Sequence, residues 1–201
     1  MNTVNLAIFG VAVIAAIVWF LVGTYPIFRY SFKKTKWERF LNTDELSRKW
    51  IIDHLLRAKN ELLILSGNLN PKVYNQEFVD VLCEKLEENS QFVVKVLSGP
   101  EVFVLRSSGN PLYNLSLDNP FPEKLHIQFL PKRPVHHFRA VDGTHLFVED
   151  PHDSHSQYRM VSTLENSFFK GWMYKREFER RWTELGRADA VSLTSINGGA
   201  S

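Results

Sequence analysis

The first 28 residues of the chain carry no charged side chain, and no other feature constrains the fold as strongly. Within this stretch, residues 6–23 form an unbroken run of apolar and small side chains. A helix of that length crosses most of the ~30 Å hydrocarbon core of a bilayer, and adding Thr24 and Tyr25 lengthens it further. We therefore predict that residues 1–28 are a membrane anchor with one transmembrane helix.

A cleaved signal peptide is the alternative for this stretch. Such a peptide has a basic N-terminal region, a shorter apolar run and a small-x-small cleavage site. This chain has no Lys or Arg before Arg29, and the bulky residues Ile27 and Phe28 follow the apolar run. These features favour a retained anchor over a cleaved one.

Basic residues gather directly after the apolar run. They are Arg29, Lys33, Lys34, Lys36 and Arg39. The positive-inside rule places such a flank in the cytoplasm, so we expect a single-pass membrane protein with its domain on the cytoplasmic side. We expect residues 29–41 to form a basic juxtamembrane linker, which can also contact anionic headgroups.

The sequence beyond this linker has the pattern of a soluble α/β domain. Two short apolar runs, residues 61–66 and 91–97, predict buried strands, and an amphipathic helical segment lies between them. The order strand, helix, strand predicts a parallel βαβ unit. Further along, Asp142 and Gly143 separate two more apolar runs, which indicates a β-hairpin.

Proline and aromatic residues set the remaining boundaries. Residues 106–122 contain several prolines, which predicts a loop. A last amphipathic helix follows, with an apolar side made of Phe168, Phe169, Trp172, Met173, Phe178 and Trp182. We expect residues 42–185 to form the domain and the small, polar residues 186–201 to be a disordered tail.

Composition excludes several classes of protein. The chain has 24 basic and 22 acidic residues, which is unlike the strongly basic profile of a dedicated nucleic-acid wrapper. Its only cysteine, Cys83, excludes a disulfide scaffold and a Cys-rich zinc module. No P-loop or dinucleotide fingerprint is present, and we expect no cofactor. Five of the seven histidines fall between His136 and His155, where the lack of tight ligand spacing favours a solvated polar loop over a metal site.

The ordered set of elements resembles one half of the phospholipase D superfamily. The resemblance covers residues 50–182 and rests on the segments IIDHLLRAKNELLILSGNL, FVDVLCEKLEENSQFVVKVLSG, LHIQFLPKRPVHHFRAVDG and STLENSFFKGWMYKREFERRW. It implies an α/β fold, namely a phospholipase-D-like half-domain with a mixed sheet flanked by helices. In this chain the half-domain is preceded by the predicted transmembrane helix.

The family's signature motif is incomplete in this sequence. That motif is H-x-K-x4-D, followed after six residues by G-S-x-x-N. Aligned on Asp142, its histidine position holds Val135 and its lysine position holds His137. A shortened version keeps His137 and Arg139 two residues apart, on one face of a strand. Asn166, in Ser-Thr-Leu-Glu-Asn, resembles the second half of the motif but lies too far downstream.

The resemblance implies phosphodiester chemistry carried out by two histidines. In such enzymes one histidine attacks phosphorus and a second, from the other half, protonates the leaving oxygen. A single half cannot supply both, so the resemblance implies a homodimer with its two-fold axis at the site. On this basis His137 is the candidate nucleophile and Arg139 the phosphate-binding cation, with support from Asp142 and Asn166.

Two functions remain open at this point. The first is a membrane-anchored phosphodiesterase acting on phospholipid or nucleic acid. The second is a catalytically inactive phospholipase-D-like module that binds a ligand or partner at the membrane, which the damaged motif favours. A third possibility for His137 and Arg139 is a strand face that is merely exposed to water.

The predicted anchor leads to a direct test. We expect the full-length chain to stay in the membrane fraction after washes with high salt and with alkaline carbonate, because residues 6–23 bury their side chains in hydrocarbon. Immunoblotting of pellet and supernatant measures this. Release of the intact chain by either wash contradicts the anchor.

Overall fold

The computed structural model describes residues 35–100, 109–151 and 159–197, with side chains described as far as Gly186. The anchor predicted over residues 1–28 lies outside these ranges. Among the helices within them, none has both the length and the apolar character needed to cross a bilayer. The description below concerns the compact unit that begins at Lys36.

Seven strands of this unit form one mixed sheet. They are β1 (Lys36–Asn42), β2 (Glu61–Ser66), β3 (Val93–Ser98), β4 (Leu125–Phe129), β5 (His137–Val141), β6 (His145–Glu149) and β7 (Arg159–Glu165). Their spatial order is β1-β7-β6-β5-β2-β3-β4. Strands β2, β3 and β4 run parallel, and every other neighbouring pair is antiparallel. The predicted parallel βαβ unit and the hairpin at Asp142 and Gly143 are both confirmed.

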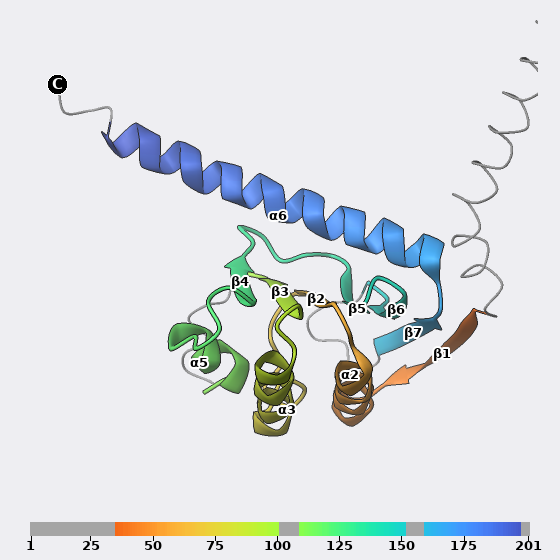
Figure 1. Cartoon of the computed structure of the whole chain (residues 1–201). Helices are drawn as coiled ribbons and strands as arrows, with labels where there is room; N and C mark the ends of the chain where they lie inside the picture. The colour runs from red at the N-terminus through yellow and green to blue at the C-terminus, as the bar shows by residue number, and fades with distance from the viewer. Residues whose placement is uncertain (1–34, 101–108, 152–158, 198–201) are drawn as a thin grey trace, which may run out of the picture. The chain divides into compact units, whose positions relative to one another are not determined.

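Helices cover both faces of the sheet (Figure 1). They are α2 (Asp44–Arg57), α3 (Gln76–Glu88), α5 (Pro111–Leu117) and α6 (Phe168–Asn197). The first three lie on one face and α6 lies on the other. Side-chain oxygens of Thr43, Asn75 and Asn110 cap the first three helices by accepting a backbone N–H three residues further on, which fixes where each helix begins.

Each face of the sheet has its own hydrophobic core. Alternate residues of the central strand β2 point to opposite faces, so that Leu62 and Ile64 pack on the side of α2 and α3 while Leu63 and Leu65 pack on the side of α6. All four are almost fully buried. This explains why the strand is a continuous apolar run rather than an alternating one.

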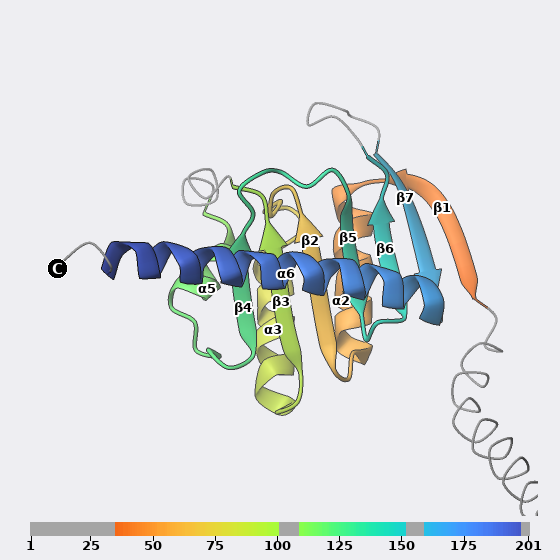
Figure 2. The same ribbon diagram turned by 90° about the horizontal axis from the view of Figure 1, so that it is seen from above.

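Helix α6 runs across the strands instead of along them (Figure 2). One helix is about 10 Å wide, whereas seven strands spaced at about 4.8 Å make a much wider sheet. By crossing, α6 reaches separate strands: Phe178 packs edge-on against Phe138 of β5, with ring centroids 6.4 Å apart, and Trp182 lies near His126 of β4. Grooves remain beside the helix because it cannot cover the whole face.

Three sequence-based boundaries need correction. The predicted linker over residues 29–41 includes most of β1, which pairs with β7 along its whole length. The charged residues of β1 led to the prediction of a linker, but an edge strand tolerates charged side chains. The predicted loop over residues 106–122 contains α5, which starts with proline at its first turn. The predicted disordered tail over residues 186–201 is helical as far as Asn197, because no glycine or proline interrupts residues 187–197.

Two glycines of α6 offer a matched test of how the helix docks. A Cβ at Gly171 would overlap the carbonyl oxygen of Gly143 in the β5–β6 turn, whereas a Cβ at Gly186 would meet open space. We expect Gly171→Ala to destabilise the domain by ~1–3 kcal/mol through overpacking. Gly186→Ala should be neutral or stabilising by up to ~1 kcal/mol because alanine favours helix. Chemical denaturation of the solubilised full chain measures both, and equal effects contradict this docking.

Candidate functional site

A small polar pocket lies at the end of the sheet where β2 finishes and β5 begins. Its volume is about 50 Å³, enough for a few water molecules or a group of similar size. Its lining residues are Ser47, Ser66, Asn68, Asn70, Val73, Tyr74, Arg133, His137, Arg139, Glu149 and Arg159. The structure thus brings His137 and Arg139 into one pocket.

The β5–β6 hairpin places a carboxylate against both residues. His137 and Glu149 are direct cross-strand partners, and Nδ1 of His137 lies 3.6 Å from Oε2 of Glu149. Arg139 is two residues further along the same face, with Nη2 3.4 Å from Oε1 of Glu149. Glu149 therefore stands between a ring nitrogen and a guanidinium.

Both ring nitrogens of His137 face acceptors. Nε2 lies 3.1 Å from the carbonyl oxygen of Pro134, and Nδ1 faces the Glu149 carboxylate. Carbonyl and carboxylate oxygens only accept hydrogen bonds, so a ring N–H is the partner that suits each contact.

Arg139 is a buried cation with spare hydrogen-bonding capacity. Its Nε donates to the hydroxyl of Tyr74 at 2.9 Å, and its guanidinium lies 4.6 Å from the ring centroid of Phe147. The residue is only 5% exposed. Its Nη1 is buried and finds no hydrogen-bond partner within the described part of the chain. A buried unpaired donor is costly, which makes this atom the clearest indication of a ligand.

Electrostatics keep the pocket charged. Burial alone would raise the pKa of Glu149, but the hydrogen bond from His137 and the charge of Arg139 outweigh it and lower that pKa to about 2. Burial raises the pKa of the Tyr74 hydroxyl, so this group stays protonated at neutral pH. The pocket therefore holds an ionised carboxylate among cations, which include Arg159.

Gly67 allows the backbone after β2 to lie close to the side chains of the pocket. A Cβ there would lie 2.8 Å from Nε2 of His137 and 2.5 Å from Nε of Arg133. Any side chain at position 67 would have to displace both groups. The loop after β2 therefore helps to fix where the His137 ring lies.

Asp142 and Asn166 do not join this pocket. Asp142 directly follows β5, at the far end from His137, and the five-residue strand separates the two by ~16 Å. Its carboxylate accepts the backbone N–H groups of Lys59, Asn60 and Glu61 at 2.9, 2.7 and 3.1 Å. Asn166 takes a positive φ of 57° in the turn that leads from β7 into α6, beside the same end of the hairpin. Asp142 and Asn166 therefore do not contact the pocket of His137, and they instead shape the turns at the opposite end of the hairpin.

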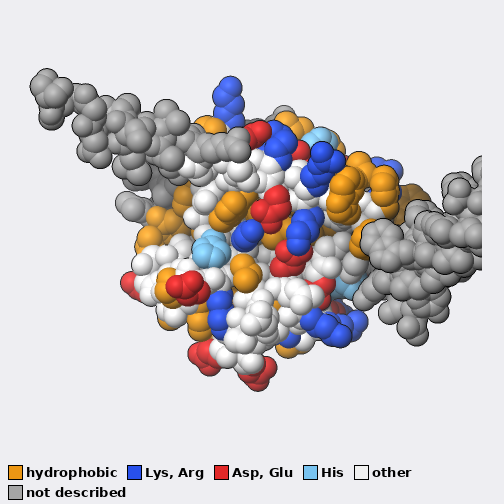
Figure 3. Space-filling view, turned by 45° about the horizontal axis from the view of Figure 1, so that its top comes forward, with side chains coloured by type: hydrophobic (Ala, Val, Ile, Leu, Met, Phe, Trp, Pro, Cys, Tyr) orange, Lys and Arg blue, Asp and Glu red, His pale blue; other side chains and the backbone are white. Residues whose placement is uncertain are grey.

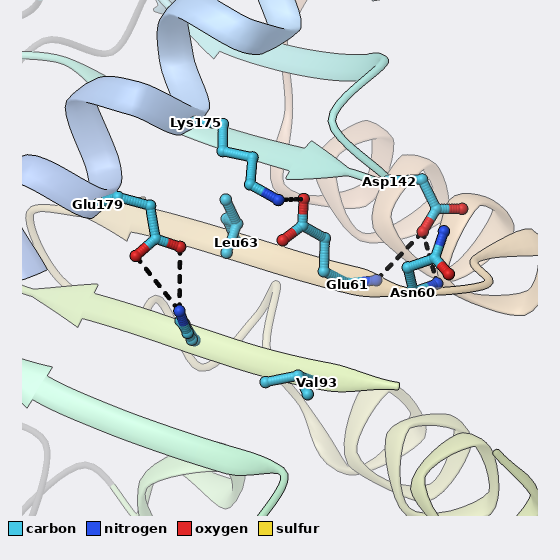
Figure 4. A pocket seen from close by; sticks show the side chains of 8 residues that line it. Asn60, Glu61, Leu63, Val93, Asp142, Lys175 and Glu179 are labelled. Atoms are coloured by element: carbon cyan, nitrogen blue, oxygen red, sulfur yellow. Dashed lines mark hydrogen bonds and ion pairs between the residues drawn. The ribbon is translucent and has the colours of Figure 1, made fainter. Parts of the chain in front are cut away.

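The larger pocket, around Asp142, is lined by oppositely charged side chains that form ion pairs (Figure 4). Lys175 lies 2.6 Å from Glu61, and Lys95 lies 3.0 Å from Glu179. These pairs connect α6 to β2 and β3. Because their charges are matched, this pocket indicates a structural contact between helix and sheet.

Most residues of the smaller pocket were not singled out from the sequence as part of the site. Among them are Tyr74, Glu149 and Arg159. The signal for Glu149 was present, because a hairpin that turns at Asp142 and Gly143 fixes the register that sets it opposite His137. Within the described ranges, no group of three His, Cys, Asp or Glu side chains is arranged to hold a metal ion, and two of the five clustered histidines, His152 and His155, lie outside them.

Comparison with known proteins gives matches in structure only. No family model and no curated protein matches the sequence. Nuc from Salmonella typhimurium, a phospholipase D family member, matches over 75% of this chain and 95% of its own, with 11% identity and a TM-score of 0.52. NucT from Helicobacter pylori matches over 75% of this chain and 97% of its own, with 8% identity and a TM-score of 0.51. The domain has the phospholipase D fold.

A further structural match is TrmBL2, an archaeal chromatin protein whose structure shows a novel mode of DNA binding. It matches over 90% of this chain, with 14% identity and a TM-score of 0.53, and the chain spans 64% of TrmBL2. The expected mixed sheet flanked by helices is confirmed. At these identities the likeness to the phospholipase D fold is a likeness of architecture.

The low pKa of Glu149 leads to a test of the pocket's electrostatics. Because this pKa falls from 4.5 to about 2 on folding, the stability that Glu149 contributes is complete above pH ~4.5 and is lost as the pH falls toward 2. We expect Glu149→Gln to cost up to ~3 kcal/mol at pH 6, and the difference from the parent to shrink steadily below pH 4.5. Denaturant unfolding of both proteins between pH 6 and pH 2.5 measures this. A difference that does not change with pH contradicts the assignment.

Proposed function

We propose that this domain binds a phosphodiester group through the pocket of His137 and Arg139, as a membrane-anchored module that does not use His137 as a nucleophile. The observation that carries the proposal is the unpaired, buried Nη1 of Arg139 in a polar pocket. A phosphate oxygen is a strong acceptor for a guanidinium N–H. The small cavity suits one phosphate group, with both ester arms outside it.

The charges in the pocket favour an anion. The guanidinium groups of Arg139 and Arg159 line the pocket together with a single carboxylate, Glu149, which also faces His137. One more negative charge would bring this cluster closer to balance. Because the pocket is buried away from bulk water, charge-assisted hydrogen bonds in it are stronger than those in water.

The geometry of His137 argues against nucleophilic attack. A nucleophilic imidazole needs one ring nitrogen free of a proton, and here both nitrogens face acceptors. The motif's lysine position is occupied by His137 itself, and Val135 holds the position of the motif's histidine. Binding without covalent chemistry is the function that fits these residues.

A phosphodiesterase is the second candidate. The fold shared with a phospholipase D family member favours it, together with the placement of His137 and Arg139 in one pocket. This activity would require a homodimer that brings a second His137 to the same phosphate. The DNA-binding description of TrmBL2 supports nucleic acid as one source of the phosphodiester, and the proposed anchor supports phospholipid as the other.

The two candidates separate in one set of measurements on the full chain in nanodiscs. We expect glycerophosphocholine, a single-stranded oligonucleotide or both to bind, and Arg139→Met to weaken binding at least tenfold through loss of the charged hydrogen bonds. Arg57→Met, at the far end of α2, is the matched control and should change binding less than twofold. Titration calorimetry measures binding, and the two ligands distinguish the lipid from the nucleic-acid source.

Hydrolysis of the same two phosphodiesters decides between binding and catalysis. We expect no cleavage above background by the parent or by His137→Gln. Cleavage by the parent that disappears in His137→Gln would establish the phosphodiesterase instead. Binding that is absent, or unchanged in a folded Arg139→Met protein, overturns the proposed pocket, with circular dichroism as the check on folding.

A further inference from the structure

The first turns of α6 leave large apolar side chains in water. Phe169 is 69% exposed, Trp172 47% and Met173 50%. These positions are three and four residues apart, so they lie on one side of the helix, and the rings of Phe169 and Trp172 stack with centroids 6.4 Å apart. Soluble monomers rarely expose a contiguous apolar group of this size without a partner for it.

An apolar groove extends this surface to the edge of the sheet. The groove has a volume of about 530 Å³ and runs between β1 and α6, where Trp37, 62% exposed, and Met173 both line it. Its apolar walls include Leu65, Phe138, Val148 and Leu164. We call the surface formed by Trp37, Phe169, Trp172 and Met173 the aromatic face; Figure 3 shows hydrophobic and basic side chains gathered toward one end of the surface that carries α6.

Basic side chains accompany the aromatic face. Between positions 168 and 181 the helix carries five Lys or Arg residues, of which three form ion pairs: Lys175 with Glu61, and Arg180 and Arg181 with Glu177. The other two lie next to the aromatic residues. The guanidinium of Arg176 lies 5.3 Å from the Trp172 ring centroid, and Lys170 lines the groove. Aromatic rings next to lysine and arginine are the combination found where proteins meet lipid headgroups.

We propose that the aromatic face lies on the surface of an anionic lipid bilayer. The inference rests on the membrane anchor included in the proposed function. Trp37 follows the apolar run of residues 6–23 by only 14 positions, so the connection reaches at most ~50 Å even when fully extended. The aromatic rings enter the headgroup region, and each nearby basic residue adds ~1 kcal/mol of attraction to an anionic surface.

A second copy of the chain is the competing occupant. Protein–protein interfaces are depleted of lysine, and their centres exclude charge. On α6, by contrast, Lys170 directly follows Phe169 and lines the groove. The composition of this surface therefore favours lipid.

Spin labels on the full chain test this proposal. One label replaces Phe169 on the aromatic face, and the control label replaces Leu56, 58% exposed on α2 on the opposite face of the sheet; both use a Cys83→Ser background. The protein is placed in nanodiscs of phosphatidylcholine and phosphatidylserine at one copy per disc. Relaxation by oxygen reports lipid, and relaxation by a water-soluble nickel complex reports solvent.

We expect Phe169→Cys to favour oxygen over nickel at least threefold more than Leu56→Cys does. Lys170→Glu combined with Arg176→Glu should remove most of that preference, because it reverses two charges at the headgroups. Equal accessibility of the two labels overturns the proposal. Protection of position 169 that appears only at high protein density in vesicles also overturns it, since a second copy then covers the face.

Failure of the anchor gives a different result in the same experiment. A chain without an inserted anchor does not co-elute with the discs in any variant, and this removes the anchor and this inference together. Failure of the inference alone leaves co-elution intact while position 169 remains in water. Phosphodiester binding by the His137 pocket is measured separately and changes in neither case.

Discussion

The Asp142 carboxylate links the two halves of the sheet at the junction of β2 and β5, on which the position of the candidate site depends. By accepting three consecutive backbone N–H groups, from Lys59 to Glu61, it fixes the end of β5 against the start of β2. That junction connects the parallel strands β2, β3 and β4 to the antiparallel strands on the other side. The same constraint places the start of β5, and with it His137, beside the end of β2 where Gly67 leaves room for the ring.

The buried pocket keeps its charged groups because each of them has partners inside the domain. Arg139 stays charged although it is almost fully buried, because Tyr74, Glu149 and the ring of Phe147 surround its guanidinium. All of these partners are needed, because removing one of them leaves the buried charge of Arg139 only partly compensated. The pocket is therefore prepared for an anion before any ligand arrives, which lowers the cost of binding.

The sequence predicted those parts of the fold that depend on local pattern. The apolar run of β2 and the turn at Asp142 were recognisable because a buried strand requires apolar residues and a tight turn favours Asp and Gly. The edge strand β1 was not, because it has partners on one side only and its exposed positions carry charges. Within the site, His137 and Arg139 were identified from one strand, whereas Tyr74 comes from a distant segment and only tertiary packing brings it to Arg139.

The charged edge of β1 bears on how copies of this chain coexist. An open edge offers backbone donors and acceptors to any other open edge, and confinement to two dimensions by the proposed anchor would raise the frequency of such encounters. The exposed ion pair of Lys36 and Glu38 lies on that strand and would have to be desolvated if another edge stacked against it. Edge-to-edge pairing of copies through β1 is thereby discouraged.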